Sequence, residues 1–249
     1  MSNKYVFNAK DATEKVTTWL KEWFEINGKD CNAIIGISGG KDSSIAAALC
    51  VKALGADRVI GVLMPQGDQL DIDFSIELCK TLGIRSHTIN IKEVIDKIYN
   101  AVGNSFEISE ASKVNLPPRI RMSILYLVGA SHNGRVINTC NLSENWIGYS
   151  TRYGDDVGDV GPLSNFTVEE VIAIGKELGL PDKFTTKIPL DGLCDKTDED
   201  NLGFTYQTLD NYIRRGIEPE PKTKERIDYL HRVNQFKLRR FDTYKYFED

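Results

Sequence analysis

The stretch "GISGGKDSS", residues Gly36 to Ser44, joins two segments of the chain that both read as buried. The preceding run, "NAIIGI" at 32–37, is short and apolar, as in a buried strand. Residues 42–54 are apolar nearly all round when they are placed on a helix. A glycine-rich turn between such a strand and such a helix lets backbone N–H groups and the helix N-terminus face an anion. The stretch therefore predicts a phosphate-binding loop.

The small residues of this loop suit that role. Gly39 and Gly40 lack the Cβ atoms that would block a close approach to a ligand. The hydroxyls of Ser38, Ser43 and Ser44 add donors, and several converging donors can hold a polyphosphate. The loop is not a Walker A motif, G-x-x-x-x-G-K-[ST], because its lysine follows the two glycines directly.

Asp42 is the unexpected member of the loop. A carboxylate repels phosphates unless a divalent cation lies between them. Asp42 therefore predicts Mg²⁺ that binds together with the phosphates. The alternative is a plain strand-to-helix turn in which Asp42 or Ser43 only caps the helix.

Beyond the loop, segments with strand and helix patterns alternate along the chain. Predicted strands cover residues 32–37, 58–64, 85–91 and 135–140, and predicted helices cover 11–27, 42–54, 72–83, 92–103, 117–134 and 166–179. Such alternation is typical of a parallel sheet with helices on both faces. No repeat, linker or low-complexity tract interrupts it, so we expect one domain over residues 1–249.

The composition narrows the class of partner. The 249 residues carry a net charge of −5, whereas a general nucleic-acid binder is usually basic. No apolar stretch approaches the length that crosses a bilayer, and the N-terminus has no signal-peptide pattern. The five cysteines are scattered without a C-x-x-C pair, which fits reduced thiols rather than a zinc site. We expect a cytoplasmic protein with no nucleic-acid or membrane partner, and anionic small molecules remain possible ligands.

The hexapeptide "SGGKDS" resembles the pyrophosphate loop of the N-type ATP pyrophosphatases. Members of that superfamily cleave ATP between the α- and β-phosphates, adenylate a substrate, and let a nucleophile displace AMP. Four further stretches are similar to blocks of the ammonia-dependent NAD synthetases, in the same order: "LMPQGDQLD" (63–71), "NLPPRIRM" (115–122), "NTCNLSENWIGYSTRYGDDVGDVGPL" (138–163) and "KIPLDGLCDKTDEDNLGFTYQTLDNYI" (187–213).

The resemblance implies an α/β fold that is Rossmann-like (adenine nucleotide alpha hydrolase-like), a three-layer sandwich with a mostly parallel sheet flanked by helices. It also implies an activity. ATP-dependent amidation converts nicotinate adenine dinucleotide (deamido-NAD) to NAD, the last step of NAD biosynthesis, and releases AMP and pyrophosphate. We see no room in the chain for an amidohydrolase domain, so free ammonia or a separate partner would supply the nitrogen. A symmetric homodimer, with the dinucleotide at its interface, is expected on the same ground; the helix at 119–128 and the aromatic residues Trp19, Trp23 and Phe24 are candidate contacts.

Site residues follow from the resemblance, position by position. The expected ATP contacts are Gly36, Ser38, Gly39, Gly40, Lys41, Asp42, Ser43, Ser44, Met64, Gln69 and Thr139. The expected substrate contacts are Asn115, Arg119, Arg121, Tyr153, Asp155 and Lys237. Asp42 and Glu144 would hold Mg²⁺, and Asp155 would orient ammonia or take its proton.

Each of the less distinctive candidates also has a purely structural explanation. Glu144, in "NLSENW", fits a helix capping box, and Asp155 fits an Asp/Gly turn. Arg119 and Arg121 follow two prolines that we expect at a helix start. Cations in a first helical turn oppose the helix dipole, so an anionic ligand would explain them; solvated surface arginines are the alternative.

The chain also departs from the family pattern in three places. Val168 stands where some members carry a lysine. Phe236 and Leu238 replace the histidine and second basic residue of a C-terminal T-x-H-K-R block, of which Lys237 remains. Arg239 and Arg240 are candidates to replace the lost contacts.

Two other classes of protein remain open at this point. Another N-type ATP pyrophosphatase is one, as an amidotransferase synthetase subunit or a tRNA thiolase, although a thiolase needs a cysteine pair and a basic face. A non-catalytic ATP-binding module, like the universal stress proteins, is the other. Pyrophosphate release separates the enzymes from the module.

Overall fold

The computed structural model describes residues 5–69, 72–186 and 197–244. The elements in chain order are α1 (Ala9–Asn27), β1 (Asn32–Gly36), α2 (Lys41–Leu54), η1 (Ala56–Arg58), β2 (Val59–Leu63), α3 (Ile72–Leu82), β3 (Arg85–Thr88), α4 (Lys92–Gly103), α5 (Glu110–Ser131), β4 (Gly134–Val136), α6 (Leu142–Ile147), α7 (Val168–Glu177), α8 (Asp182–Thr185), α9 (Asp198–Leu202), α10 (Tyr206–Asp210), η2 (Asn211–Arg215), α11 (Pro221–Asn234) and η3 (Gln235–Leu238).

The four strands form one parallel sheet in the order β3-β2-β1-β4. Alternate side chains of a strand point to opposite faces, and the two central strands, β1 and β2, are buried on both faces, whereas the edge strand β3 is exposed. Ala33, Ile35, Val59 and Leu63 enter one core cluster, whereas Ile34, Ile60, Val62 and Val136 enter another. The predicted parallel sheet, covered on both faces, is confirmed.

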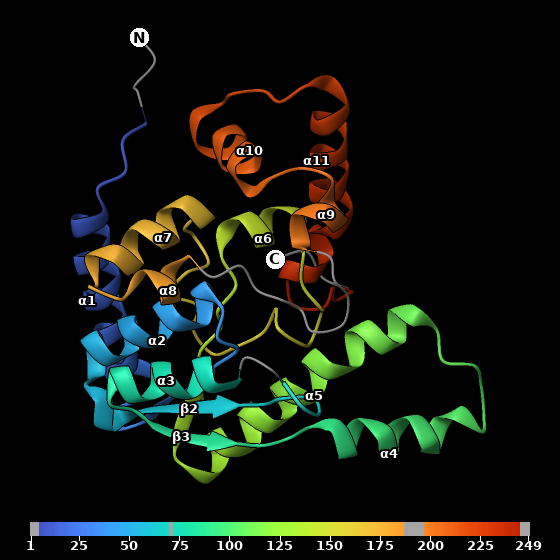
Figure 1. Cartoon of the computed structure of the whole chain (residues 1–249). Coiled ribbons are helices and arrows are strands. Elements are labelled where there is room, and N and C mark those ends of the chain that lie inside the picture. The colour runs from blue at the N-terminus through green and yellow to red at the C-terminus, as the bar shows by residue number, and fades with distance from the viewer. Residues whose placement is uncertain (1–4, 70–71, 187–196, 245–249) are drawn as a thin grey trace.

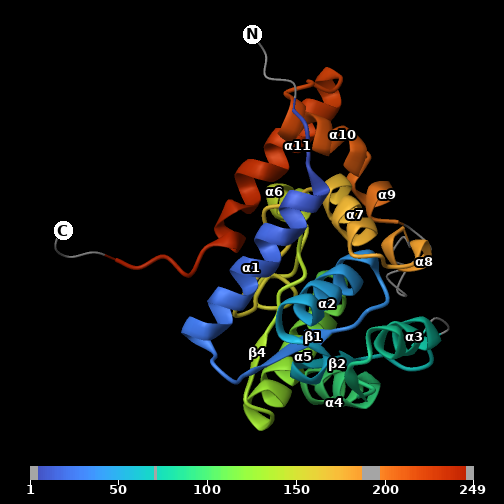
Figure 2. The same cartoon turned by 90° about the vertical axis from the view of Figure 1, so that its left-hand side faces the viewer.

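Helices form the two outer layers (Figures 1 and 2). The first core cluster joins the sheet to α1, α2, α3 and α7, and the second joins it to α4 and α5. Phe24, which the sequence offered as a contact for a second subunit, is 1% exposed and belongs to the first cluster. The sandwich therefore has the three layers that the resemblance implies.

Helix α5 begins earlier than the sequence predicted. Its N-cap is Ser109, whose hydroxyl accepts a hydrogen bond from Ser112 N at 3.2 Å, so both prolines lie inside the helix. Pro117 has no N–H to donate to the carbonyl of Lys113. The hydroxyl of Tyr99 in α4 donates to that carbonyl instead, at 3.3 Å. Tertiary contact thus replaces a hydrogen bond that the proline removes.

The earlier start of α5 changes the position of two candidate arginines within the helix. Arg119 and Arg121 lie well beyond the first turn of α5. The helix dipole acts mainly within the first and last turns. The expectation that these arginines oppose the dipole is therefore wrong, and their roles must be judged from their contacts.

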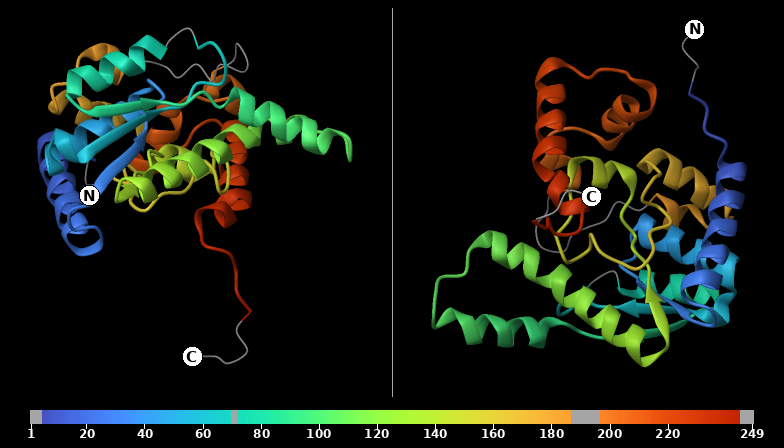
Figure 3. Two further views of the ribbon diagram at one scale, coloured as in Figure 1. Left: turned by 90° about the horizontal axis from the view of Figure 1, so that it is seen from below. Right: turned by 180° about the vertical axis from the view of Figure 1, so that it is seen from behind.

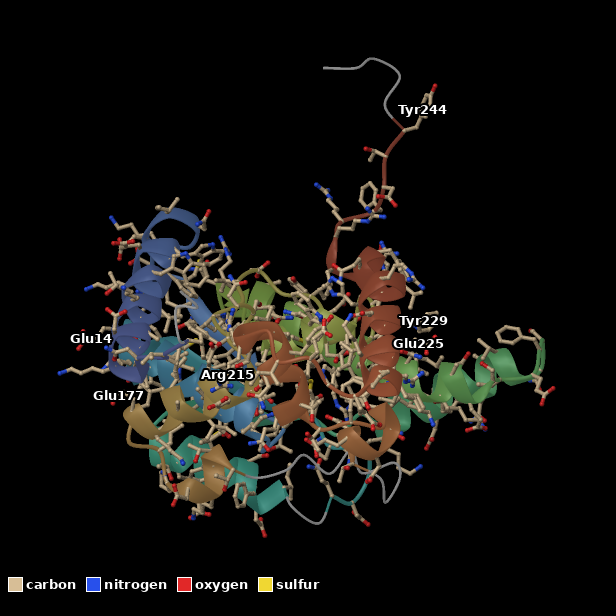
Figure 4. The ribbon with its side chains drawn as sticks, turned by 90° about the horizontal axis from the view of Figure 1, so that it is seen from above. Glu14, Glu177, Arg215, Glu225, Tyr229 and Tyr244 are labelled. Carbon is tan, nitrogen blue, oxygen red and sulfur yellow. The ribbon has the colours of Figure 1, made fainter. Side chains whose placement is uncertain are left out.

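Helix α4 and the first half of α5 project together beyond the sheet (Figures 1 and 3). The C-terminal third is mostly helical, as predicted, and a third core cluster gathers residues of α6, α9, α10 and α11. After η3, the chain runs away from the body of the protein, with Tyr244 near its end (Figure 4). No helix within the described ranges combines the length and the apolar character needed to cross a bilayer.

The packing of α7 on α2 depends on Gly175. A Cβ at this position would lie 2.8 Å from Ile45 Cδ1 and 2.8 Å from Thr185 Cγ2. Alanine is intrinsically the better helix former by about 1 kcal/mol, yet overpacking a core costs about 1–3 kcal/mol. We expect Gly175→Ala to lower the free energy of unfolding by about 1–2 kcal/mol, measured by urea denaturation.

Gly103, the last residue of α4, is a matched control. A Cβ there would meet only Ile108 Cδ1, at 4.0 Å. We expect Gly103→Ala to leave stability unchanged or slightly raised. Equal urea midpoints for the two variants would contradict the close packing at Gly175.

Candidate active site

The candidate site lies where the sheet order changes direction. Successive connections place β2 and β3 on one side of β1, and β4 on the other. The loops that leave the carboxyl ends of β1 and β4 therefore diverge, and ligands of open α/β sheets bind in such a crevice. A cavity of about 250 Å³ is found there, lined by Ser38, Gly40, Asp42, Ser43, Thr139, Cys140, Glu144, Tyr149, Asp155 and Asp198.

The glycine-rich loop forms one wall of this cavity. Gly39 has φ +81°, a left-handed conformation that favours glycine. The serine hydroxyls hold the turn: Ser38 Oγ lies 3.1 Å from Ser43 Oγ, and Ser44 Oγ donates to Gly40 O at 2.8 Å. The N-cap of α2 is Gly40, and no side chain caps the helix. The alternative in which Asp42 or Ser43 caps the helix is therefore wrong, and the N-terminus of α2 can face an anion.

Asn141 joins the two acidic candidates across the crevice. This side chain is fully buried, and its amide group donates to Asp42 Oδ1 at 3.1 Å. Its Oδ1 accepts from Glu144 N at 3.0 Å, while Glu144 Oε2 accepts from Asn141 N at 3.1 Å. Glu144 thus completes a capping box on α6 and also lines the cavity. The structural and the functional interpretations of this residue are compatible.

Negative charge is concentrated in this site. Among the residues that the structure describes, those that line the cavity include four carboxylates and no lysine or arginine. Burial, and then the charge of Asp42, raise the pKa of Glu144 to about 8. Burial and the same carboxylates also hold the pKa of the Cys140 thiol well above its ordinary value. Phosphates can enter such a pocket only if cations come with them.

Asp155, an exposed residue on the loop at 151–155, also lines the cavity. Thr151 N donates to Asp155 Oδ1 at 2.8 Å, and the amide of Asn138 donates to the Asp155 carbonyl at 2.9 Å. The surrounding protein atoms desolvate the carboxylate and raise its pKa. The neighbouring Tyr153 has φ +61° and an exposed ring, with the Arg152 guanidinium 4.9 Å from its centroid.

Helix α5 supports this loop rather than lining the cavity. Thr151 Oγ1 donates to Asn115 Oδ1 at 2.9 Å, and Arg119 Nε donates to Arg152 O at 3.2 Å. A Cβ on Gly154 would lie 2.9 Å from Pro118 Cβ, so the second proline packs closely against the loop.

Arg121, also on α5, contacts the chain beyond β2 and not the loop at 151–155. Its Nε donates to the carbonyl of Met64 at 3.1 Å, just beyond β2, and burial lowers the pKa of its guanidinium. The Met64 side chain is itself buried in the second core cluster, and a Cβ on Gly36 would lie 3.4 Å from its Cε.

Lys237 of η3 also supports the chain around the cavity. Its ammonium donates to Gly148 O at 2.8 Å and to Ser150 O at 3.2 Å. Burial lowers the pKa of Lys237, and the nearby carboxylates of Asp155 and Asp156 oppose that shift.

The predicted residues therefore divide into two groups. The cavity brings together Ser38, Gly40, Asp42, Ser43, Thr139, Glu144 and Asp155. The cavity lining does not include Gly36, Gly39, Lys41, Ser44, Met64, Gln69, Asn115, Arg119, Arg121, Tyr153 or Lys237. Arg239 and Arg240, the suggested replacements, contact Asp242 and Phe241.

Sequence reasoning missed four residues at the site. Asn141, Cys140 and Tyr149 lie in the quoted stretch 138–163, and Asp198 lies in the quoted stretch 187–213, but none was given a role. A usable signal was present for Asn141, because N-x-x-E before a short helix is a capping-box pattern.

The donor chemistry of the site fits Mg²⁺. This ion prefers oxygen ligands and is usually bound by one or two carboxylates together with water and substrate phosphates. Asp42 and Glu144 supply two carboxylates beside a phosphate-binding loop. No group of three histidine, cysteine or acidic side chains in the described ranges is arranged to hold a metal by itself. A magnesium ion at this place would therefore depend on the substrate's phosphates.

Strand order, the glycine-rich loop after β1 and the acid after β4 define an α/β protein with a candidate phosphate-binding site at the switch point of its sheet. The profile of the NAD synthase family matches residues 12–243. The chain belongs to the NAD synthase family.

Individual relatives agree with this assignment. The chain is similar to the NH(3)-dependent NAD(+) synthetase of Thermococcus kodakarensis, with 38% identity over 230 residues, which cover 88% of this chain and 89% of that protein. Among solved structures, it resembles an NMN synthetase from Francisella tularensis (TM-score 0.88, 32% identity, covering 97% of this chain and 100% of that one). It also resembles an NH3-dependent NAD synthetase from Campylobacter jejuni (TM-score 0.77, 28% identity, covering 96% and 100%).

The raised pKa of Glu144 predicts how stability depends on pH when metal is absent. The folded protein binds this proton more tightly than the unfolded chain, so stability falls as pH rises from about 4.5 to about 8. Glu144→Gln cannot ionise, and glutamine keeps the capping-box geometry. We expect this variant to melt above the wild type at pH 8.5 in EDTA and to lose that advantage at pH 5.

Glu225→Gln, an exposed change on α11 (Figure 4), serves as the control. Its melting curve should follow the wild type at both pH values. If the wild type and Glu144→Gln differed in melting temperature by the same amount at both pH values, the electrostatic description of the site would be wrong.

Proposed function

We propose that this protein amidates deamido-NAD with ammonia, at the expense of ATP, and releases AMP and pyrophosphate. One observation carries the proposal: Asp42 and Glu144 converge, through Asn141, beside an uncapped helix N-terminus at the switch point of the sheet. That arrangement suits the triphosphate of ATP with its metal. The names of the family's members supply the product, NAD, and the nitrogen source, and the resemblance described above supplies the acceptor.

The first step is adenylation of the acceptor. A carboxylate oxygen of the nicotinate ring attacks the α-phosphorus of ATP, and the bond to the bridging oxygen of the β-phosphate breaks. The N-terminus of α2 and the loop hydroxyls hold the pyrophosphate that leaves. Asp42 and Glu144 would hold Mg²⁺, which neutralises the charge of the phosphates when it is bound.

The second step is attack by ammonia. Its nitrogen adds to the carbonyl carbon of the acyl-adenylate, and the bond to the AMP oxygen breaks. The nitrogen must lose a proton, and Asp155, which lines the cavity, is the candidate acceptor. Desolvation raises the pKa of this carboxylate, which strengthens it as a base.

A second acceptor is favoured by a specific observation. The Francisella structure that this chain resembles with a TM-score of 0.88 is named an NMN synthetase. In addition, Phe236 replaces a histidine that the resemblance implies for dinucleotide contact, and its ring lies 5.1 Å from the Arg152 guanidinium instead. Nicotinate mononucleotide is therefore a candidate substrate beside the dinucleotide.

The proposal also includes the domain organisation, the compartment and the class of substrate. We propose that residues 1–249 act as one domain, in the cytoplasm, on small-molecule substrates. The four cysteines that the structure describes are buried and free, which supports a reducing compartment.

We also propose a symmetric homodimer. Tyr126 and Leu127 expose apolar surface on α5, at 40% and 66%, and Tyr244 of the C-terminal arm is 89% exposed. Trp19 on α1, another candidate contact, is 43% exposed, while Trp23 packs against the first core cluster. Exposed apolar side chains that lie together often mark an interface.

We expect pyrophosphate, AMP and an amidated nucleotide from ATP, Mg²⁺, ammonium and the acceptor, with little product when glutamine replaces ammonium. Asp42→Ala should lower this rate by about a hundredfold or more, because it removes a charge that holds the metal and the phosphates. Liquid chromatography with both acceptors in parallel gives the ratio of their kcat/KM values.

Asp57→Ala, an exposed change at the opposite end of the sheet, should keep wild-type turnover. Turnover by Asp42→Ala equal to the wild type would contradict the metal assignment. No amide from either acceptor, with ATP bound, would contradict the proposed function.

The dimer has its own test. Leu127→Glu places a charge within the exposed apolar surface of α5, so we expect it to shift the protein from dimer to monomer in light scattering after size exclusion. Lys80→Glu, an exposed change on α3, should leave the dimer intact. A monomeric wild type, or a dimeric Leu127→Glu protein, would contradict this surface.

A further inference from the structure

Lys41 forms an ion pair within the glycine-rich loop and does not line the cavity. Its ammonium lies 2.7 Å from Asp42 Oδ2, and only 8% of the residue is exposed. The carboxylates of Glu144 and Asp198 also act on its charge. The ring of Tyr206 lies beneath it, with the ammonium 5.9 Å from the centroid.

The charges around Lys41 would be costly without it. Asp42 and Glu144 both line the cavity, and none of its described lining residues carries a positive charge. Charged groups that leave water are tolerated when they are paired. The ammonium of Lys41 is a positive charge in direct contact with this group of acids.

The same contact occupies an expected metal ligand. Asp42 Oδ1 accepts from the Asn141 amide at 3.1 Å, and Oδ2 accepts from Lys41 at 2.7 Å. A divalent cation that binds Asp42 must therefore replace or share one of these partners. The Asn141 amide is fully buried and fixed by α6, whereas lysine has a long, flexible stem.

We infer that Lys41 is an internal counter-ion, which neutralises the acidic crevice in the metal-free enzyme and is displaced from Asp42 when the divalent cation binds. This inference rests on the proposed metal site at Asp42 and Glu144. It assigns to Lys41 a positioning role in place of the direct contact with ATP that the resemblance implied.

Tyr206 gives independent support for a second arrangement of this region. The residue is 9% exposed, and its buried hydroxyl has no hydrogen-bond partner within the part of the chain that the structure describes. Buried hydroxyls are nearly always paired. The ring serves as the floor beneath the ammonium, and the hydroxyl remains available for a different occupant of the crevice.

The test measures metal binding without turnover. Mn²⁺ is titrated into the full-length protein, and free ion is followed by electron paramagnetic resonance. We expect Lys41→Met to bind Mn²⁺ about tenfold more tightly than the wild type, because no internal cation competes for Asp42. In EDTA the same variant should melt below the wild type, and added Mn²⁺ should close that gap.

Two further variants control for charge and for folding. Lys41→Arg keeps the positive charge, so its Mn²⁺ affinity should stay near the wild-type value. This variant also keeps the test decisive if Lys41→Met does not fold in EDTA, since a gain in its affinity would overturn the inference. Lys15→Met removes a lysine from an exposed ion pair with Asp11 and should change neither quantity.

Asp42→Asn distinguishes a failure of the metal site at Asp42 and Glu144 from a failure of the counter-ion role of Lys41. Loss of Mn²⁺ binding in Asp42→Asn, with Lys41→Met equal to or weaker than the wild type, would overturn the counter-ion role and leave the metal site standing. Wild-type Mn²⁺ binding by Asp42→Asn would overturn the metal site, and with it the inference about Lys41. Tighter binding by Lys41→Met, lost again when Asp42→Asn is added, is the result that we expect.

Discussion

The hydrogen bonds of one buried side chain, Asn141, hold this site together. They join the acid that follows β1 to the acid that caps the helix after β4, so two segments far apart in the chain meet as one acidic crevice. Bringing like charges together in a partly buried place is unfavourable unless cations accompany them. That constraint explains why a phosphate-binding loop carries Asp42, and why the pocket needs positive charge from a metal, from Lys41, or from both in turn.

The sheet and the helices around it position the residues of this crevice. The parallel sheet places the ends of β1 and β4 side by side, and the layers of helices pack on its two faces through the two core clusters. Helix α5 reaches the 151–155 loop through Asn115, Arg119 and Pro118 and so supports Asp155 in the cavity lining. Several residues that a family resemblance would describe as ligand contacts are, in this structure, contacts within the protein. Ligand binding at those positions would have to compete with these contacts or add to them.

Local patterns predicted the layers, the strand–loop–helix unit and the helix at 166–179, which corresponds to α7 and begins with a capping box between Thr167 and Glu170. The start of α5 was missed because the two prolines were taken as its first turn, although Ser109 is the better cap. Asn141 could not be found as the link to Asp42 from spacing, since the two residues are 99 positions apart. The direction of the Lys41 side chain likewise depends on carboxylates from three separate segments. Sequence patterns predict local structure well, but they do not reveal which charged residues, far apart in the chain, lie close together in the fold.

The crevice is proposed to transfer the adenylyl group of ATP to the carboxylate of the acceptor. An acceptor labelled with ¹⁸O in its carboxylate tests this directly, by mass spectrometry of the nucleotide products. One carboxylate oxygen should leave with AMP when ammonia attacks, so labelled AMP and unlabelled pyrophosphate are expected. Unlabelled AMP, with the label in pyrophosphate or inorganic phosphate, would mean that the acceptor attacks another phosphorus, and the assignment of the loop would be wrong.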